Sequence, residues 1–254
     1  MTSSATSAIM LRRIDFGDYD LIVTFYTFDR GKVTAIAKAA KKSKKRFAGI
    51  LELFSLLNIV YTSPRGGTLP VLQEASLISS YYKIRADIKK TAYASYWAEL
   101  INSWAEDNEK NAQLFILFKQ LLFELDLGRI PDETLSIVFQ MRFLKLAGIC
   151  PDLSVCSVCK RGIENFKSGG FFLYIKKGGL VCKNCMAENS GGSYLSAGTV
   201  KQLLWIEQGS LKKALRIKLS SAGTMESQRF LEKFVPYHTE KELKSLNFLR
   251  QIRG

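Results

Sequence analysis

The sequence predicts an α+β protein, in which a five-stranded barrel is followed by helices that a cysteine-rich insertion interrupts. Residues 5–80 contain short alternating, β-branched and aromatic runs separated by turn residues. From residue 81 the apolar residues recur at helical spacing. Between about 149 and 195 that spacing stops, and paired cysteines and glycine doublets replace it. We therefore expect one domain over residues 1–80 and a helical domain over 81–254, with the insertion at about 149–195.

The first domain is expected to contain five strands, at Ala8–Ile14, Asp20–Phe28, Lys32–Ala37, Ile50–Tyr61 and Leu69–Ser79. Gly31 suits a turn between the second and third strands, and residues 63–67 suit another turn. In the third strand, Lys32, Thr34, Ile36 and Lys38 share one face, opposite the apolar face of Val33, Ala35 and Ala37. Five such strands favour a small closed barrel, because closure removes exposed sheet edges.

Six helices are expected after residue 80, over 81–106, 111–127, 131–148, 196–206, 224–234 and from 239 onward. Gly128 ends the second helix, and Pro131 opens the third. Thr239 and Glu242 have the spacing of a capping box at the start of the last one. A short strand over Phe171–Ile175 lies within the insertion.

Residues 38–46 form a basic run, KAAKKSKKR, between the third and fourth expected strands. The whole chain has a formal net charge of +14. A cationic loop on a rigid sheet is suited to bind phosphate groups, although lysines in a solvated loop can serve solubility alone. The candidate cations for binding the phosphates of a nucleic acid are Arg12, Arg13, Lys32, Lys38, Lys41, Lys42, Lys44, Lys45 and Arg46. Tyr26 and Phe28 are candidates for base stacking, with packing in the core as the alternative.

Two C-x-x-C pairs, Cys156/Cys159 and Cys182/Cys185, are separated by 22 residues. Four thiolates on two tight turns can complete a tetrahedral, structural Zn²⁺ site of the zinc-ribbon type, with no open position for catalysis. A redox dithiol and two disulfides are the alternatives. The fifth cysteine, Cys150, is expected to be a small buried side chain or an extra thiol near the site.

The residues favour a binding protein over an enzyme. His238 is the only histidine, and it precedes an expected helix, where capping or packing is its expected role. Gly31-Lys32 does not fit a phosphate-binding P-loop. Asp15, Asp18 and Asp20 could hold a metal for a nuclease, but acids in a turn are more often solvated. We expect a cytoplasmic location, because no apolar run reaches membrane-span length and we find no signal peptide.

The chain resembles the RecO family of bacterial recombination mediators over nearly its whole length. The resemblance lies in the order and spacing of LRRIDFGDYDLIVT (11–24), FDRGKV (28–33) with the basic loop, GICPDL (148–153) before Cys156, LKS (243–245) and FL (248–249). The basic loop departs from the family's frequent glycine-arginine form, since it has AAKK at 39–42.

This resemblance implies an N-terminal OB-fold barrel and a helical domain with a zinc-binding insertion. It also implies binding of single- and double-stranded DNA, annealing of complementary strands, partnership with RecR, contact with single-strand-binding protein, and help in loading RecA at the nucleoid. A metal-dependent nuclease and an RNA-binding zinc-ribbon scaffold remain as alternatives.

Overall fold

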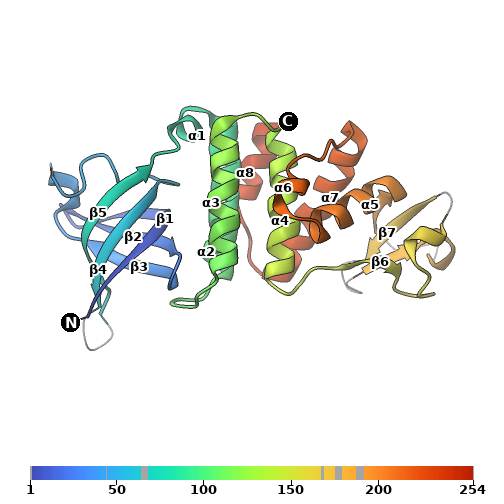
Figure 1. Ribbon diagram of the computed structural model, residues 1–254, viewed down its shortest axis with the longest axis horizontal. Helices are drawn as coiled ribbons and strands as arrows, with labels where there is room; N and C mark the ends of the chain where they lie inside the picture. Colours follow the sequence, from blue (N-terminus) through green and yellow to red (C-terminus); the bar gives the residue numbers. More distant parts are fainter. Residues whose placement is uncertain are drawn as a thin grey trace. The chain divides into compact units, whose positions relative to one another are not determined.

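The computed structural model describes residues 2–43, 45–63, 68–166, 169–174, 179–186 and 192–253 (Figure 1). The chain divides into two compact units, one formed by residues 1–128 with 243–254 and the other by 129–242. Within the described parts of the chain, no helix is both long and apolar enough to cross a membrane.

The first unit begins with a closed barrel of strand order β1-β2-β3-β5-β4, which confirms the predicted five-stranded, OB-like domain. Its strands are β1 (Thr2–Phe16), β2 (Asp20–Thr27), β3 (Gly31–Ala37), β4 (Leu56–Ser63) and β5 (Val71–Ser79). Neighbouring strands are antiparallel except β3 and β5, which meet in parallel at Ile36 and Val71. Met10, Phe25 and Ala35 point into the core, and the alternation predicted for β3 is present.

The fourth strand starts later than the sequence predicts, at Leu56 instead of Ile50. Phe54 has a left-handed backbone with φ 69°, and its N–H donates to Met10 O at 3.0 Å. Leu51 joins the barrel core, and Phe54 is also buried. An apolar run therefore continues the core through an irregular segment, without forming a strand. Residues 64–67 of the predicted turn lie outside the described residues.

The helices of the first unit are α1 (Tyr82–Ala86), α2 (Ile88–Trp104), α3 (Ala112–Leu127) and α8 (Lys244–Arg253). The single helix predicted over 81–106 is wrong, because Asp87 has an extended backbone and interrupts it. The Asp87 carboxylate accepts the N–H groups of Lys89 and Lys90 and so caps α2. Gly128 ends α3 with φ 68°, as predicted.

The predicted helix start at Thr239 is also wrong. Thr239 is the last residue of α7 (Ser221–Thr239), where its hydroxyl donates to Val235 O at 3.2 Å. Helix α8 begins at Lys244. There the Glu99 carboxylate of α2 accepts the N–H groups of Lys244 at 3.2 Å and Ser245 at 2.8 Å. The chain thus returns to the first unit, and α8 packs on α2.

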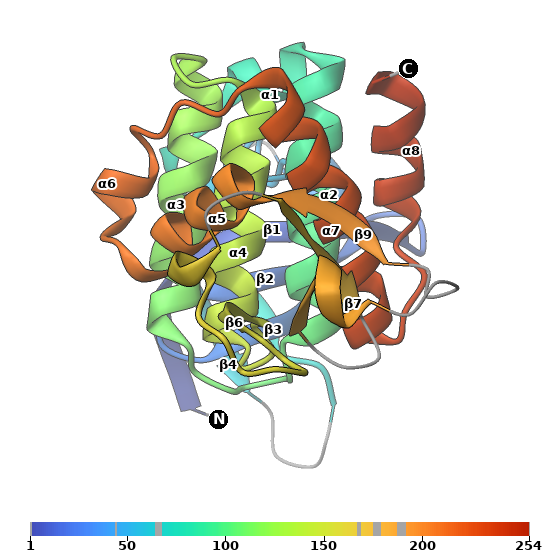
Figure 2. The same ribbon diagram turned by 90° about the vertical axis from the view of Figure 1, so that its right-hand side faces the viewer.

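The second unit combines helices with a four-stranded sheet of order β6-β8-β7-β9. Figure 2 shows β7 beside β9, to which it is antiparallel. The strands are β6 (Asp152–Cys156), β7 (Gly170–Tyr174), β8 (Gly179–Cys182) and β9 (Ser193–Ser196), and the helices are α4 (Asp132–Leu146), α5 (Ala197–Gln208), α6 (Leu211–Ala214) and α7. Helix α7 packs on α4 and β9, and it includes Pro236 beyond the predicted end at Phe234.

Candidate nucleic-acid interface and metal centre

The basic loop leaves β3 at Lys38 and is held by the turn between β1 and β2. Ala39 has a left-handed backbone with φ 54°, and its N–H donates to the Asp20 carboxylate at 2.7 Å. The Lys41 N–H donates to Tyr19 O at 3.0 Å. Residues Ala40–Lys42 then form one turn of 3-10 helix, labelled η1. The loop therefore has a defined backbone over residues 38–43.

Most cations of this loop are exposed, and several contact groups of the same turn. Lys41 Nζ lies 3.1 Å from both Asp15 Oδ2 and Gly17 O. Lys42 Nζ lies 3.5 Å from the centroid of the Tyr19 ring. Arg46 donates to Lys38 O at 3.0 Å. Lys38 and Lys45 are exposed as well, whereas Lys44 lies outside the described residues.

The three remaining candidate cations have different surroundings. Arg12 is exposed on β1. Arg13 pairs with Glu52 at 2.8 Å and donates to Leu51 O at 3.0 Å. Lys32 is partly buried, and its Nζ lies 3.2 Å from Asn102 O and 3.4 Å from Asp107. The structure therefore brings Arg12 and the described loop cations to the surface and gives Lys32 a structural role beside α2.

The two aromatic candidates pack against α3. Tyr26 is buried, and its ring stacks on Phe115 with centroids 6.5 Å apart. Burial raises the pKa of Tyr26, and the nearby Glu109 raises it further. Phe28 makes an edge contact with Phe115 at 5.6 Å. Both side chains thus serve the packing of the barrel on the helices.

Sequence analysis missed two exposed aromatics beside the basic loop. Phe16 is 50% exposed and Tyr19 is 46% exposed, and they flank the Gly17-Asp18 turn between β1 and β2. The signal that could have identified them is their position: aromatics on either side of a tight turn have no core to enter. Stacking on exposed rings next to cations is how single strands bind without sequence preference.

An apolar row crosses the outer face of the barrel next to these aromatics. Ile14 pairs with Ile22, and Ile22 pairs with Ile36, so the three side chains lie in line across β1, β2 and β3. Their neighbours Val23 and Ala35 point into the core, which places the isoleucines on the outside. Each is at least partly exposed. Exposed aromatics, an apolar row and neighbouring cations together give this surface the composition on which a nucleic-acid strand can stack and be held by its phosphates.

The aspartates of the nuclease alternative have other partners. Asp15 pairs with Lys41, and Asp20 accepts the N–H of Ala39. Among the described residues, these acids do not form a cluster that could hold a metal ion. Asp15 and Asp20 instead position the basic loop.

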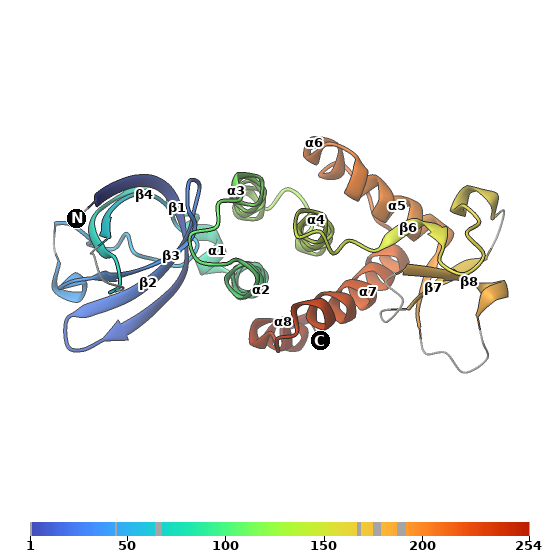
Figure 3. The same cartoon turned by 90° about the horizontal axis from the view of Figure 1, so that it is seen from below.

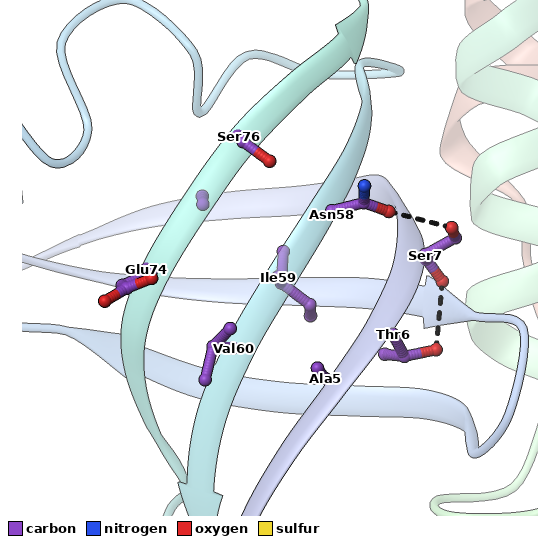
Figure 4. A pocket seen from close by; sticks show the side chains of 9 residues that line it. Ala5, Thr6, Ser7, Asn58, Ile59, Val60, Glu74 and Ser76 are labelled. Atoms are coloured by element: carbon purple, nitrogen blue, oxygen red, sulfur yellow. Dashed lines mark hydrogen bonds between the residues drawn. The ribbon is translucent and has the colours of Figure 1, made fainter.

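Another part of the barrel surface, shown in Figure 4, is lined by described residues that carry no positive charge. A pocket of about 380 Å³ lies over β1, β4 and β5, where Ser7 Oγ donates to Asn58 Oδ1 at 2.9 Å. Glu74 lines it and carries a negative charge, and none of the lining residues that the structure describes is a cation. This face is therefore unsuited to phosphate groups.

The four cysteines of the insertion converge. The Sγ atoms of Cys156, Cys159, Cys182 and Cys185 all lie within 4.8 Å of one another, and those of Cys159 and Cys182 are 4.0 Å apart. Tetrahedral Zn²⁺ with Zn–S bonds of about 2.3 Å places its sulfurs about 3.8 Å apart, so the cluster fits such an ion. A disulfide needs about 2.05 Å, and the cysteines are free.

Backbone donors favour the thiolate that a metal requires. Burial alone would raise the pKa of Cys156, but backbone N–H groups, first of all that of Cys182 at 3.4 Å, lower it to about 6. A hydrogen bond with the Cys182 thiol raises the pKa of Cys185 to about 12, which a bound cation would reverse. Burial raises the pKa of Cys150 to about 12, and this thiol is not part of the cluster.

His238 lies in the last turn of α7, inside the helix and not before one as the sequence suggested. Its ring centroid is 4.2 Å from that of Phe234. Within the part of the chain that the structure describes, its Nε2 has no hydrogen-bond partner. Packing is thus its observed role.

Comparisons with known proteins cover both units. A family model described as Recombination protein O N terminal matches residues 1–81, and one described as Recombination protein O C terminal matches residues 85–247. "DNA repair protein RecO" of Desulfatibacillum aliphaticivorans is 45% identical over the whole chain and 98% of the relative. The protein of that name from Desulfosudis oleivorans is 42% identical, over 100% and 99% of the two chains. That of Syntrophus aciditrophicus is 33% identical over 98% and 95%.

Proposed function

The chain belongs to the RecO family of DNA repair proteins, and from this premise we propose that it binds DNA and anneals complementary strands during recombinational repair. The observation that carries the proposal is the set of exposed loop cations, Lys38, Lys41, Lys42, Lys45 and Arg46, beside the two exposed aromatic rings. Asp15, Asp20 and Tyr19 anchor the loop. Single and double strands share the phosphate charge that such a surface attracts.

Annealing in this proposal needs no covalent step. Two strands repel each other through their phosphates, and cations of the loop lower that repulsion by displacing counterions. Bases that rest on Phe16, Tyr19 and the isoleucine row keep their hydrogen-bonding edges accessible, because stacking uses only the ring faces. Lys41 would exchange its Asp15 partner for a phosphate, so its contribution is expected to be smaller than that of an unpaired lysine.

Zn²⁺ is proposed as the structural ion of the cysteine cluster. Cys156 and Cys182 end strands β6 and β8, so an ion there would link the two short strands to the turns that follow them. Once bound, the ion would supply cross-links and no catalytic chemistry, since four thiolates leave no open position.

The partners follow from the family and are proposed with it: RecR, single-strand-binding protein and the loading of RecA on DNA, in the cytoplasm at the nucleoid. A strand-annealing assay in the presence and absence of single-strand-binding protein tests the first part of this scheme. Faster pairing on protein-coated strands would support it, whereas cleavage of the oligonucleotides with Mg²⁺ would favour a nuclease.

The basic loop is tested by replacing Lys41, Lys42, Lys44 and Lys45 together with Ala. Each phosphate contact contributes about 0.7 to the log–log salt slope for single strands, so the slope should flatten by roughly 3. Affinity should fall about equally for all sequences, because phosphate contacts carry no base information. The matched control replaces the same four residues with Arg, which keeps the charge. A slope that the Ala variant leaves unchanged would show that the loop is not the DNA contact.

A further inference from the structure

The second unit exposes a tryptophan amid cations that the proposed function does not use. Trp205 on α5 is 52% exposed, whereas Trp97 is fully buried and Trp104 is partly buried. The Trp205 indole therefore offers a ring face on which a planar ligand can stack.

The exposed cations around Trp205 come from α5, from α6 and from the segment that follows α6. They are Lys201, Lys212, Lys213, Arg216 and Lys218. Lys201 lies one helical turn before Trp205, on the same face of α5. Lys213 Nζ lies 5.9 Å from the Trp205 ring centroid, and Lys218 O accepts a hydrogen bond from Gln202 at 3.2 Å. Figure 3 shows α6 next to α5.

Two side chains of α4 hold the backbone at the end of α5 and in the connection to α6. The Arg142 guanidinium of α4 donates to Gly209 O in the connection between α5 and α6, and burial lowers its pKa. Lys145 pairs with Glu207 at 2.8 Å and donates to Glu207 O at 3.1 Å. The acid nearest the tryptophan in sequence is thus engaged by α4.

Unlike Lys145, the five cations around Trp205 are not neutralised by a neighbouring acid among the residues that the structure describes. Across the described parts of the chain, none of them makes an ion pair with a carboxylate. Residues 150–254, which contain them, carry 17 Lys/Arg against 8 Asp/Glu. Unpaired charge of one sign over a small area attracts a polyanion and not a neutral partner.

We propose that Trp205 and these five cations form a second binding site for single-stranded nucleic acid, separate from the basic loop of the first unit. A polynucleotide offers both groups that the site can use, a planar base for the indole and phosphates for the cations. An acidic peptide would supply the charge without the ring. If the chain anneals DNA strands, as proposed above, two such sites would let each strand of the pair bind its own surface. The existence of the second site does not depend on annealing.

Trp205 itself reports on the site. The experiment titrates an oligo(dT) into the protein whose Lys41, Lys42, Lys44 and Lys45 are replaced with Ala, so that the first site contributes little. Tryptophan emission should be quenched, and the quench should disappear in Trp205→Phe while binding measured by anisotropy persists. Trp205→Ala should weaken that binding about tenfold, because a stacked base is lost. Binding that Phe preserves and Ala weakens indicates stacking of a base on the ring at position 205, and not a structural role of the tryptophan.

The charge requirement is tested by replacing Lys212, Lys213, Arg216 and Lys218 with Ala. The salt slope should flatten by roughly 3. The charge-conserving control, with Lys212→Arg, Lys213→Arg, Arg216→Lys and Lys218→Arg, should keep the wild-type slope. An emission spectrum that saturating oligo(dT) leaves unchanged would overturn the proposal, whatever the basic loop does. Equal quenching by poly-glutamate at the same charge concentration would overturn it in favour of an acidic partner.

Discussion

At Gly31 the backbone of the barrel lies directly against the backbone of the segment between α2 and α3. The Gly31 backbone has φ 61°, and a Cβ there would lie 1.8 Å from Glu109 O. The neighbouring Lys32 O accepts the N–H of Asn108 at 3.0 Å. The sequence predicts the turn that needs glycine, but not this contact, because its partner lies far along the chain between α2 and α3.

Gly31→Ala should therefore destabilise the protein by at least about 2 kcal/mol, the sum of left-handed strain and displacement of the 105–110 segment. Gly17→Ala is the matched control: it has φ 56°, with no atom within 4 Å of the added Cβ. Only the conformational cost of about 1 kcal/mol should appear there. Urea unfolding measures both free energies, and equal losses would show that the Glu109 contact gives way without cost.

Phe16 and Tyr19 should contribute to DNA affinity in a way that salt does not affect. Replacing either with Ala removes a stacking surface worth about 1–3 kcal/mol per base, but no phosphate contact. Single-strand affinity should fall while the salt slope stays constant, whereas in the basic-loop variant the affinity falls and the slope flattens as well. Phe123→Ala, which removes an aromatic 46% exposed on α3, is the control. A wild-type affinity in the Phe16 and Tyr19 variants would remove them from the interface.

His238 should make stability depend on pH. Burial lowers its pKa below the ordinary 6.5, so the unfolded chain binds the proton more readily than the folded chain. The free energy of unfolding should decrease as the pH falls below about 6.5, until the lower folded pKa is passed. Thermal melts between pH 5.5 and 7.5 measure this. Because no other histidine is present, the difference between the wild-type and His238→Phe profiles should give the contribution of the imidazole. The Cys156 thiol, whose pKa is about 6, titrates in the same range and is the same in both proteins. An unaltered profile would assign the dependence to other groups.

At the scale of elements, local patterns predicted most of the fold. Alternation predicted β3, and β-branched and aromatic residues predicted β2. Asn111 and Gly128 delimited α3, because such signals lie within or next to the element itself. The start of α8 was mispredicted since its capping carboxylate, Glu99, is 145 residues away from Lys244. Cysteine spacing likewise predicted the four-thiol cluster, whereas the neighbours of Arg13 and Lys32 come from tertiary packing.

Cys182→Ser should lose bound zinc and loosen the β6–β9 sheet, because three thiolates hold the ion less tightly than four. Atomic absorption gives the metal content, and limited proteolysis reports on residues 149–196. Cys150→Ser is the control, as this thiol lies outside the cluster and should leave the zinc content unchanged. Absence of zinc from the wild-type protein would refute the structural role of the ion. Single-strand binding by the basic loop should survive in Cys182→Ser.

At the scale of the whole molecule, positive charge lies at both ends of the sequence. Residues 81–149 carry nine cations and nine acids, while the basic loop and the Trp205 region each present exposed lysines. The sequence predicts this distribution, but it does not show which cations have partners. Only the structure separates Lys32 and Lys145, which are engaged, from the free cations near Trp205.

If each surface holds one strand, neutralising both should slow annealing more than neutralising either. Variants of the loop lysines, of Lys212, Lys213, Arg216 and Lys218, and of all eight can be compared by stopped-flow pairing of complementary oligonucleotides at low salt. We expect both partial variants to be slower than wild type and the combined variant to approach the rate without protein. A combined variant no slower than the loop variant would indicate that the two surfaces do not act on the same reaction.

The return of α8 to α2 has a consequence for synthesis on the ribosome. Domains usually fold as they emerge, in order from the N-terminus. Here Leu246 and Leu249 are buried, and the Glu99 carboxylate accepts the N–H groups of Lys244 and Ser245. The helices translated first must therefore wait for residues 243–253, and a premature stop before that point would leave an apolar side of α2 bare for chaperones to recognise.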